Sequence, residues 1–230
     1  FHARILPRQN SLITICAAQS GRMEIDMYII KPYDRSRAVS YARRWALDRN
    51  PLFIDFTGRG GDCTSFVSQC VLAGGCIMDY TPTFGWYYIS SADRAPSWTG
   101  VEYFYDYMTG AGDFPPSITH PGPFGIEIPL DDAREGDVIQ LSDSAGDFYH
   151  SLLIVDFRNG VPLVAAHSDD HLDRPLSEYN YSGLRVIGIQ GFRVEAPDGS
   201  CYEALLAGES IPGPEGVPIT PAEQINPPME

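Results

Sequence analysis

The spacing of apolar residues changes partway along the chain. Between about residues 35 and 108, apolar side chains recur three and four positions apart, which is the period of a helix that buries one face. From about residue 137 they alternate with polar side chains, which is the period of a half-buried strand. Helices followed by antiparallel strands predict an α+β fold in which N-terminal helices pack on an antiparallel β-sheet.

Local signals place the expected helices. Asp34 can cap a first helix, which ends at Asn50-Pro51 because the residue before a proline disfavours helical backbone. A second helix is expected over about residues 63–73. Thr99 and Glu102 form a capping box that opens a third helix.

Four strands are expected in the second half of the chain, and a turn at Asn159-Gly160 joins two of them. The stretches 80–98 and 110–129 are rich in turn-forming residues and are predicted to be loops. The expected strands cover residues 137–142, 148–157, 161–167 and 185–195.

The expected domain organisation is a single domain with two extensions. Residues 33–206 form the domain, and residues 1–32 are an N-terminal extension expected to lie outside the fold. Two arginines precede a short apolar run at residues 12–18, a faint likeness to an export signal that leaves the compartment open between cytoplasmic and secreted or cell-wall associated. Residues 207–230 form a proline-rich acidic tail that is expected to be disordered.

The net charge of the chain disfavours some classes of binding partner. The chain has 230 residues, with 30 acidic against 16 basic side chains and a formal net charge of −14. The sequence lacks the basic patches that nucleic acids and anionic membranes require. It also lacks an apolar run of the roughly 20 residues that span a bilayer. A substrate that is neutral or cationic is therefore expected, because the protein repels polyanions.

The number and spacing of the cysteines do not predict a disulfide framework. Five cysteines are an odd number, and no two of them form a Cys-x-x-Cys pair. A disulfide framework or a thiolate zinc site is therefore not expected, and no metal or other cofactor is assigned. Cys70 is interpreted as a small core residue on the second helix.

Cys63 is the most informative residue of the chain. It follows Gly60-Gly61, which allow a sharp turn, and Asp62, a suitable N-cap. Cys63 is therefore expected in the first turn of a helix, where free N–H groups and the positive end of the helix dipole favour the thiolate. The same N–H groups could stabilise an oxyanion. The alternative is that Cys63 is a small buried residue of an amphipathic helix.

A cysteine nucleophile requires a base, and the strands carry candidate histidines. If Asn159-Gly160 is a two-residue turn, His150 faces Asp169 and His167 faces Leu152 on the same side of the hairpin. His150, His167 and Asp169 would then converge, with one group accepting a proton and another orienting the imidazole. A one-residue bulge would reverse one strand. The alternative is that these are ordinary polar residues at a strand end.

The ordered motifs resemble the bacterial putative amidase domain family. They are Tyr33-Asp34-Arg35, the segment from Gly60 to Cys70, His150-Ser151, His167-Ser168-Asp169 and Arg174-Pro175-Leu176. The resemblance covers about residues 33–193, and that family is similar to the papain-like cysteine amidases and peptidases of the NlpC and CHAP type. It implies Cys63 as nucleophile, His150 as base and His167 as orienting group, with Asp169 and Asp62 as possible supports. It also implies hydrolysis of peptide or cell-wall peptide amide bonds through a thioester. Ser65 stands where the family more often has asparagine.

Two other functions remain open at this stage. A metal-dependent hydrolase could use His167, Asp169 and His171 together with the neighbouring acids, although the HExxH and calcium-loop spacings are absent. A catalytically silent module could instead bind a peptide or a sugar. Its binding surface would be the aromatic loop that follows the second helix. A serine hydrolase is disfavoured because there is no GxSxG motif.

The same aromatic loop is the candidate substrate wall of an amidase. Trp86, Tyr88 and Trp98 lie in a stretch without regular periodicity, directly after the helix that carries Cys63. Aromatic side chains in such a loop can offer rigid apolar contact to a substrate. The alternative is that the loop closes the core beneath it.

Overall fold

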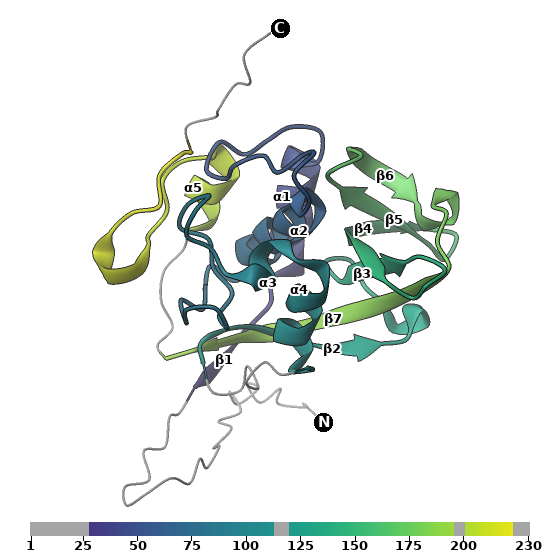
Figure 1. The fold of residues 1–230 in the computed structure, drawn as a ribbon, viewed down its shortest axis with the longest axis horizontal. Coiled ribbons are helices and arrows are strands. Elements are labelled where there is room, and N and C mark those ends of the chain that lie inside the picture. The colour runs from purple at the N-terminus through teal and green to yellow at the C-terminus, as the bar shows by residue number, and fades with distance from the viewer. Residues whose placement is uncertain (1–27, 113–119, 196–200, 223–230) are drawn as a thin grey trace, which may run out of the picture.

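The fold is an α+β domain built on one curled antiparallel sheet (Figure 1). The computed structural model describes residues 28–112, 120–195 and 201–222. Within them the strand order is β1-β7-β3-β4-β5-β6, and β2 also pairs with β7. The strands are β1 (Ile29–Pro32), β2 (Gly122–Ile128), β3 (Val138–Ser142), β4 (Phe148–Arg158), β5 (Val161–Ala166), β6 (His171–Pro175) and β7 (Gly183–Val194).

The helices lie against one side of this sheet. Helices α1 and α2 pack on each other and on β4, and Figure 1 shows them between the sheet and the C-terminal helix α5. The helices are α1 (Arg35–Trp45), α2 (Asp62–Ala73), α3 (Pro96–Thr99), α4 (Val101–Thr109) and α5 (Tyr202–Ala207), with short 3₁₀ turns η2 (Leu130–Asp132), η3 (Leu176–Glu178) and η4 (Pro214–Gly216). The expected α+β architecture, with helices packed on an antiparallel sheet, is confirmed.

Alternate residues of the central strands serve two separate cores. Val138 and Leu153 belong to the large cluster that contains the helices. Leu141 and Leu152 belong to a second cluster on the opposite face, which η3 covers with Leu176. Because strand side chains alternate between faces, a residue's position in β3 or β4 decides which core it meets.

The predicted elements largely match, with three strands missed. β3, β4, β5 and β7 lie close to the four expected strands. β1, β2 and β6 were not predicted, because β1 falls in the presumed extension and β2 in a stretch rich in glycine and proline. β1 and β2 gain their stability from pairing with β7, which is distant in sequence, and local patterns do not report such pairing. β6 pairs with the neighbouring strand β5 but consists of half-buried residues without a clear apolar alternation.

Two of the three expected caps differ from the prediction. Asp34 caps α1 by accepting a hydrogen bond from the Arg37 N–H at 3.1 Å. At α2 the cap is Gly61, with φ of +98°, and Asp62 is the first helical residue. α4 begins after Gly100 without a side-chain cap, since Thr99 ends α3.

Both domain boundaries extend beyond the predicted ones. β1 pairs with β7 from Ile29 to Pro32, so the fold begins before residue 33. Ile211 and Ile219 form a buried β-bridge within the segment predicted to be disordered. The Ala222 N–H also donates to the Pro51 carbonyl at 2.7 Å. The remaining parts of both extensions, residues 1–27 and 223–230, lie outside the described residues.

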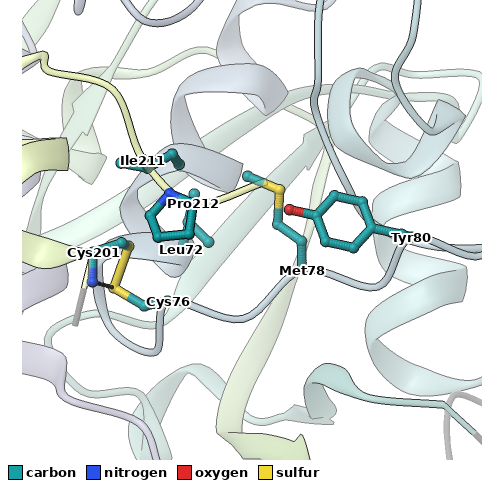
Figure 2. Close-up of a pocket in the computed structure, with 7 residues that line it drawn as sticks. All are labelled: Leu72, Cys76, Met78, Tyr80, Cys201, Ile211 and Pro212. Carbon is teal, nitrogen blue, oxygen red and sulfur yellow. Dashed lines mark hydrogen bonds between the residues drawn. A yellow bond between two sulfur atoms is a disulfide. The ribbon is translucent and has the colours of Figure 1, made fainter. Parts of the chain in front are cut away.

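A disulfide fastens this C-terminal segment, contrary to the expectation from the cysteine count. Cys76, just after α2, is bonded to Cys201, just before α5, across 125 positions with a Cα–Cα distance of 5.5 Å. Figure 2 shows the bond beside a small hollow of about 60 Å³ that Leu72, Met78 and Tyr80 also line. The cysteine count did not reveal this single disulfide, because other cysteines of the chain, Cys63 and Cys70, are free thiols.

Each helix in the described part of the chain is too short or too polar to cross a lipid bilayer.

Candidate functional site

Cys63 lies in the first turn of α2, buried with 5% of its surface exposed. The approach requires glycine at position 61, because a Cβ there would meet the Thr99 carbonyl oxygen at 2.8 Å and the φ angle is positive. The sulfur lies 3.8 Å from the Thr64 hydroxyl and receives a backbone hydrogen bond from Ser151 on β4. The nucleophile candidate is thus placed between a helix start and a strand.

The thiol of Cys63 is expected to be protonated at neutral pH. Burial raises its pKa above the ordinary value, and hydrogen bonds from Ser151 and Thr64 offset this only in part. Burial therefore works against the thiolate that the helix start was expected to favour. A base that removes the thiol proton would supply the thiolate that attack requires.

His150, the base candidate, is a partly buried residue of β4, directly before the buried run that begins at Ser151. It pairs with Leu141 in β3, and its ring packs near Tyr149 and Tyr179 at centroid distances of 6.2 and 6.1 Å. Burial lowers the pKa of His150 to about 4, against the opposing charge of Asp169. The ring is therefore neutral at neutral pH, the form in which an imidazole can accept a proton.

The structure brings the backbone of β4, and not the His150 imidazole, next to Cys63. Ser151, whose N–H reaches the Cys63 sulfur, is the residue that follows His150 on β4. Within the described ranges no hydrogen bond joins the His150 imidazole to the thiol or to any other group. Because successive side chains of a strand point to opposite faces, His150 lies on the face of β4 opposite to the one that Ser151 presents to α2.

His167 does not meet His150 and is held elsewhere. It is 1% exposed, with its Nδ1 atom 3.1 Å from Asp62 Oδ2 and its Nε2 atom 2.9 Å from the Trp45 carbonyl oxygen. Its ring stacks on Phe66 with a centroid distance of 4.0 Å. The His167 ring thus lies between Asp62 at the start of α2 and Trp45 at the end of α1, and neither nitrogen contacts the His150 imidazole.

A β-bulge explains why His167 does not converge with His150 as predicted. Near the turn, Arg158 pairs with Val161 as predicted. An extra residue, Val155, then shifts the register, so that Leu153 pairs with Ala165. Continued along the hairpin, this register places His167 opposite Ser151, whose hydroxyl contacts α2, while His150 faces the other side.

Asp62 is the centre of a buried charge cluster. Its side chain is 2% exposed, and Oδ1 accepts the Phe56 N–H at 2.9 Å. Oδ2 lies 3.4 Å from Arg49 Nε as well as 3.1 Å from His167. Arg49 also binds both oxygens of Asp170 at 2.9 and 3.0 Å. Arg49 was not singled out in the sequence, because its partners lie on three separate segments.

Asp169 acts on His150 only through its charge. Its carboxylate is 76% exposed and hydrogen-bonds to His171 Nε2 at 2.9 Å, and it lies 3.4 Å from Arg174. The opposing charge of Asp169 favours protonated His150, so the two lie in the same neighbourhood. This matches the predicted support role in position but not in hydrogen bonding.

The aromatic residues predicted to line the substrate cleft belong instead to the core. Trp86, Tyr88 and Trp98 are 0, 1 and 0% exposed. The Trp86 indole donates to the Ser68 hydroxyl at 3.2 Å, and the Tyr88 hydroxyl accepts the Ile54 N–H at 3.1 Å. The loop follows no regular period because its side chains fill an irregular space over α2. Their assignment as a substrate wall is wrong.

Several polar residues beside Cys63 were missed by the sequence reasoning. Thr64, Ser151 and Gln140 are fully buried and Arg185 is 9% exposed. A signal was present, since Gln140 and Ser151 interrupt apolar strands at positions that face the helix core. Buried polar residues at such positions normally form a hydrogen-bonded network.

The acidic residues of the turn after β5 are engaged by cations of the protein. Asp170 binds Arg49, and Asp173 binds Arg43 at 2.9 Å. Among the residues with a described placement, no group of three or more His, Cys, Asp or Glu is arranged to hold a metal ion. The metal-dependent alternative therefore has no geometric support in this part of the chain.

The fold and this site define a globular α+β domain with a buried cysteine in the first turn of a helix that packs on an antiparallel sheet. The chain belongs to the putative amidase domain family, whose model matches residues 32–187. It is 31% identical over 143 residues to an uncharacterized protein, YhbB, of Bacillus subtilis. That match covers 60% of this chain and 42% of the relative, so the chain spans less than half of it. No solved structure matches.

Proposed function

We propose that the chain is a cysteine-dependent amidase in which Cys63 is the nucleophile and His150 the general base. Membership of the putative amidase domain family supports an amide-bond hydrolase. The observation that carries the nucleophile assignment is the position of Cys63 in the first turn of α2, on the approach that only glycine at position 61 allows. His150 is proposed as base because its imidazole is neutral and it neighbours Ser151, whose backbone contacts the sulfur, and the proposal requires its side chain to reach Cys63 from the other face of β4.

The proposed reaction proceeds through a thioester. His150 accepts the thiol proton as the sulfur attacks the amide carbonyl carbon, and N–H groups at the start of α2 stabilise the oxyanion. Protonated His150 then gives this proton to the leaving amine as the C–N bond breaks. Water, deprotonated by His150, attacks the thioester and releases the acid and the Cys63 thiol.

In the proposed resting state Cys63 and His150 are both neutral, in contrast to a thiolate–imidazolium pair. Burial disfavours the charged form of both groups, raising the pKa of Cys63 and lowering that of His150. Proton transfer therefore accompanies attack on the carbonyl. A papain-like relationship of the NlpC or CHAP type remains part of the proposal and is consistent with a cysteine helix packed on an antiparallel sheet.

The proposed substrates are peptides or cell-wall peptides with neutral or cationic groups near the scissile bond. The net charge of −14 disfavours polyanionic substrates. A catalytically silent binding module is the alternative function, and its aromatic binding loop has lost support because Trp86, Tyr88 and Trp98 are buried.

The decisive experiment compares two cysteine variants. Cys63→Ala should abolish hydrolysis of a peptide-amide library while leaving the fold intact, and peptide mapping after iodoacetamide treatment should find the label on Cys63. Cys70→Ala, on the same helix and fully buried, is the matched control and should retain activity. A chelator should have no effect. Full activity in Cys63→Ala would refute the proposal, and activity lost to the chelator would favour a metal enzyme.

A further inference from the structure

A continuous chain of buried polar groups leads from the protein surface to the Cys63 sulfur. Arg185 Nε donates to Gln140 Oε1 at 2.7 Å, and Gln140 Nε2 lies 3.2 Å from the Ser151 hydroxyl. Ser151 Oγ lies 3.0 Å from Thr64 Oγ1, which lies 3.8 Å from the Cys63 sulfur. The chain joins β7, β3, β4 and α2.

The orientation of the Gln140 amide is fixed by two partners that have no choice of role. A guanidinium can only donate, so the oxygen of Gln140 must face Arg185. A main-chain carbonyl can only accept, and the Val101 oxygen lies 2.8 Å from Gln140 Nε2. The amide nitrogen therefore donates to Ser151 as well.

This orientation allows every remaining hydrogen bond to point toward Cys63. Because the Ser151 oxygen accepts from Gln140, its own hydrogen is available to Thr64. The Thr64 oxygen can then accept from Ser151, which leaves its own hydrogen for the Cys63 sulfur. Each group donates to the next, so the chain ends in a donor aimed at the nucleophile candidate.

Arg185 is held firmly at the beginning of the chain. Its guanidinium carbon lies 3.7 Å from the Tyr105 ring centroid and 3.8 Å from that of Phe148, so the group is placed between two aromatic rings. Nη2 forms an ion pair with Glu102 at 3.0 Å. The arginine therefore cannot rotate to release Gln140 without losing three sets of contacts.

We propose that Arg185 is a positioning residue, which acts through Gln140, Ser151 and Thr64 to place a hydrogen-bond donor on the Cys63 sulfur. The donor stabilises the negative charge that develops on sulfur when the thiol loses its proton. The role in turnover rests on the proposed function, whereas the effect on the thiol itself does not.

The test measures the rate of Cys63 alkylation by iodoacetamide across pH, which needs no substrate. Thr64→Val keeps the shape of the side chain but removes the donor, so the rate at pH 8 should fall about tenfold, equivalent to about one pKa unit for the thiol. Thr64→Ser keeps a hydroxyl and should restore most of the rate. Gln140→Glu replaces the donating nitrogen with an acceptor and should lower the rate like Thr64→Val.

Ser68→Ala is the matched control. Ser68 is a buried hydroxyl on the same helix whose partners are Trp86 and the Trp98 carbonyl, so its loss should leave the alkylation rate unchanged. An unchanged rate in Thr64→Val, or an equal fall in Thr64→Ser, would overturn the positioning role. Activity that survives in Cys63→Ala would instead refute the proposed function, so the two failures are distinguishable.

Discussion

His167 Nδ1 lies 3.1 Å from Asp62 Oδ2, with both side chains almost completely buried. This contact joins the end of β5 to the first residue of α2, the residue before Cys63. A buried carboxylate is costly unless it is paired, and Asp62 is paired with both His167 and Arg49. His167 therefore fixes the position of the nucleophile helix and has no free nitrogen with which to orient His150.

Replacing His150 and replacing His167 should therefore have different effects on activity and stability. His150→Ala should reduce kcat by several orders of magnitude and leave the melting temperature near that of the wild type, because its ring makes no hydrogen bond. His167→Ala should destabilise the fold by roughly 3–5 kcal/mol, since it removes one of the buried partners of Asp62 and leaves the Trp45 carbonyl without its own. Steady-state kinetics and chemical unfolding on the same preparations separate the two effects.

Exogenous imidazole provides the control for the first variant. It should restore part of the activity of His150→Ala and none of that of His167→Ala. A stable His167→Ala protein with wild-type unfolding but no turnover would show that His167 takes part in the chemistry after all.

Burial of His150 also predicts how stability depends on pH. Its pKa is about 4 in the fold, below the 6.5 of an exposed histidine, so the unfolded chain binds more protons between these values. Its contribution is complete above pH 6.5 and is lost as the pH falls toward 4. Urea unfolding should show roughly 2–3 kcal/mol less stability at pH 4.5 than at pH 7 from this group alone.

His150→Gln isolates that contribution, because glutamine does not titrate. The variant should lose correspondingly less stability between pH 7 and pH 4.5 than the wild type. Identical pH dependence in both proteins would mean that His150 is more hydrated than its position in β4 indicates. For activity, the acid limb of kcat/KM should lie near pH 4, where His150 becomes protonated.

The sequence predicts the parts of this fold that depend on local patterns. Asp34 caps its helix as expected, and the period-two stretches mark β3, β4, β5 and β7. Cys63 could be placed at a helix start because Gly61 and the apolar spacing after it are neighbours in sequence. These features follow from propensity and periodicity within a few residues.

What the sequence does not predict depends on distant contacts. The extra residue Val155 is apolar, like the neighbours it interrupts, so no pattern reveals the bulge that separates His150 from His167. Arg49 has three carboxylate partners that only the fold brings together. The burial of Trp86 likewise follows from how the loop after α2 folds back over that helix.

The Cys76–Cys201 bridge should contribute substantially to stability. It closes a loop of 125 residues, and a bridge across a loop of that size restricts the unfolded chain by an amount on the order of 4 kcal/mol. Addition of a reductant, or the paired change of both cysteines to serine, should therefore lower the melting temperature by several degrees. Non-reducing peptide mapping should recover the two cysteines in one linked fragment.

Cys70→Ala is again the control, because Cys70 is a free thiol in the same region of α2. Its melting temperature should respond to the reductant as the wild type does. A melting temperature that does not change on reduction would contradict a stabilising bridge.

The last prediction concerns the aromatic residues, because the structure buries those expected to bind substrate and exposes another, Tyr149, next to His150. Trp86→Ala should unfold more easily by roughly 3–5 kcal/mol, because the ring is fully buried and its indole is hydrogen-bonded to Ser68. Tyr149 is 49% exposed and lies beside His150 with the two rings 9° from parallel. Tyr149→Ala should therefore change stability little and raise KM several-fold, with kcat less affected, because it removes an aromatic surface next to the base. Phe84→Ala, which truncates an aromatic residue that is 46% exposed in the loop first expected to line the cleft, should leave both KM and stability near wild type. If Phe84→Ala raised KM and Tyr149→Ala did not, the substrate would bind on the side of the loop and not beside β4.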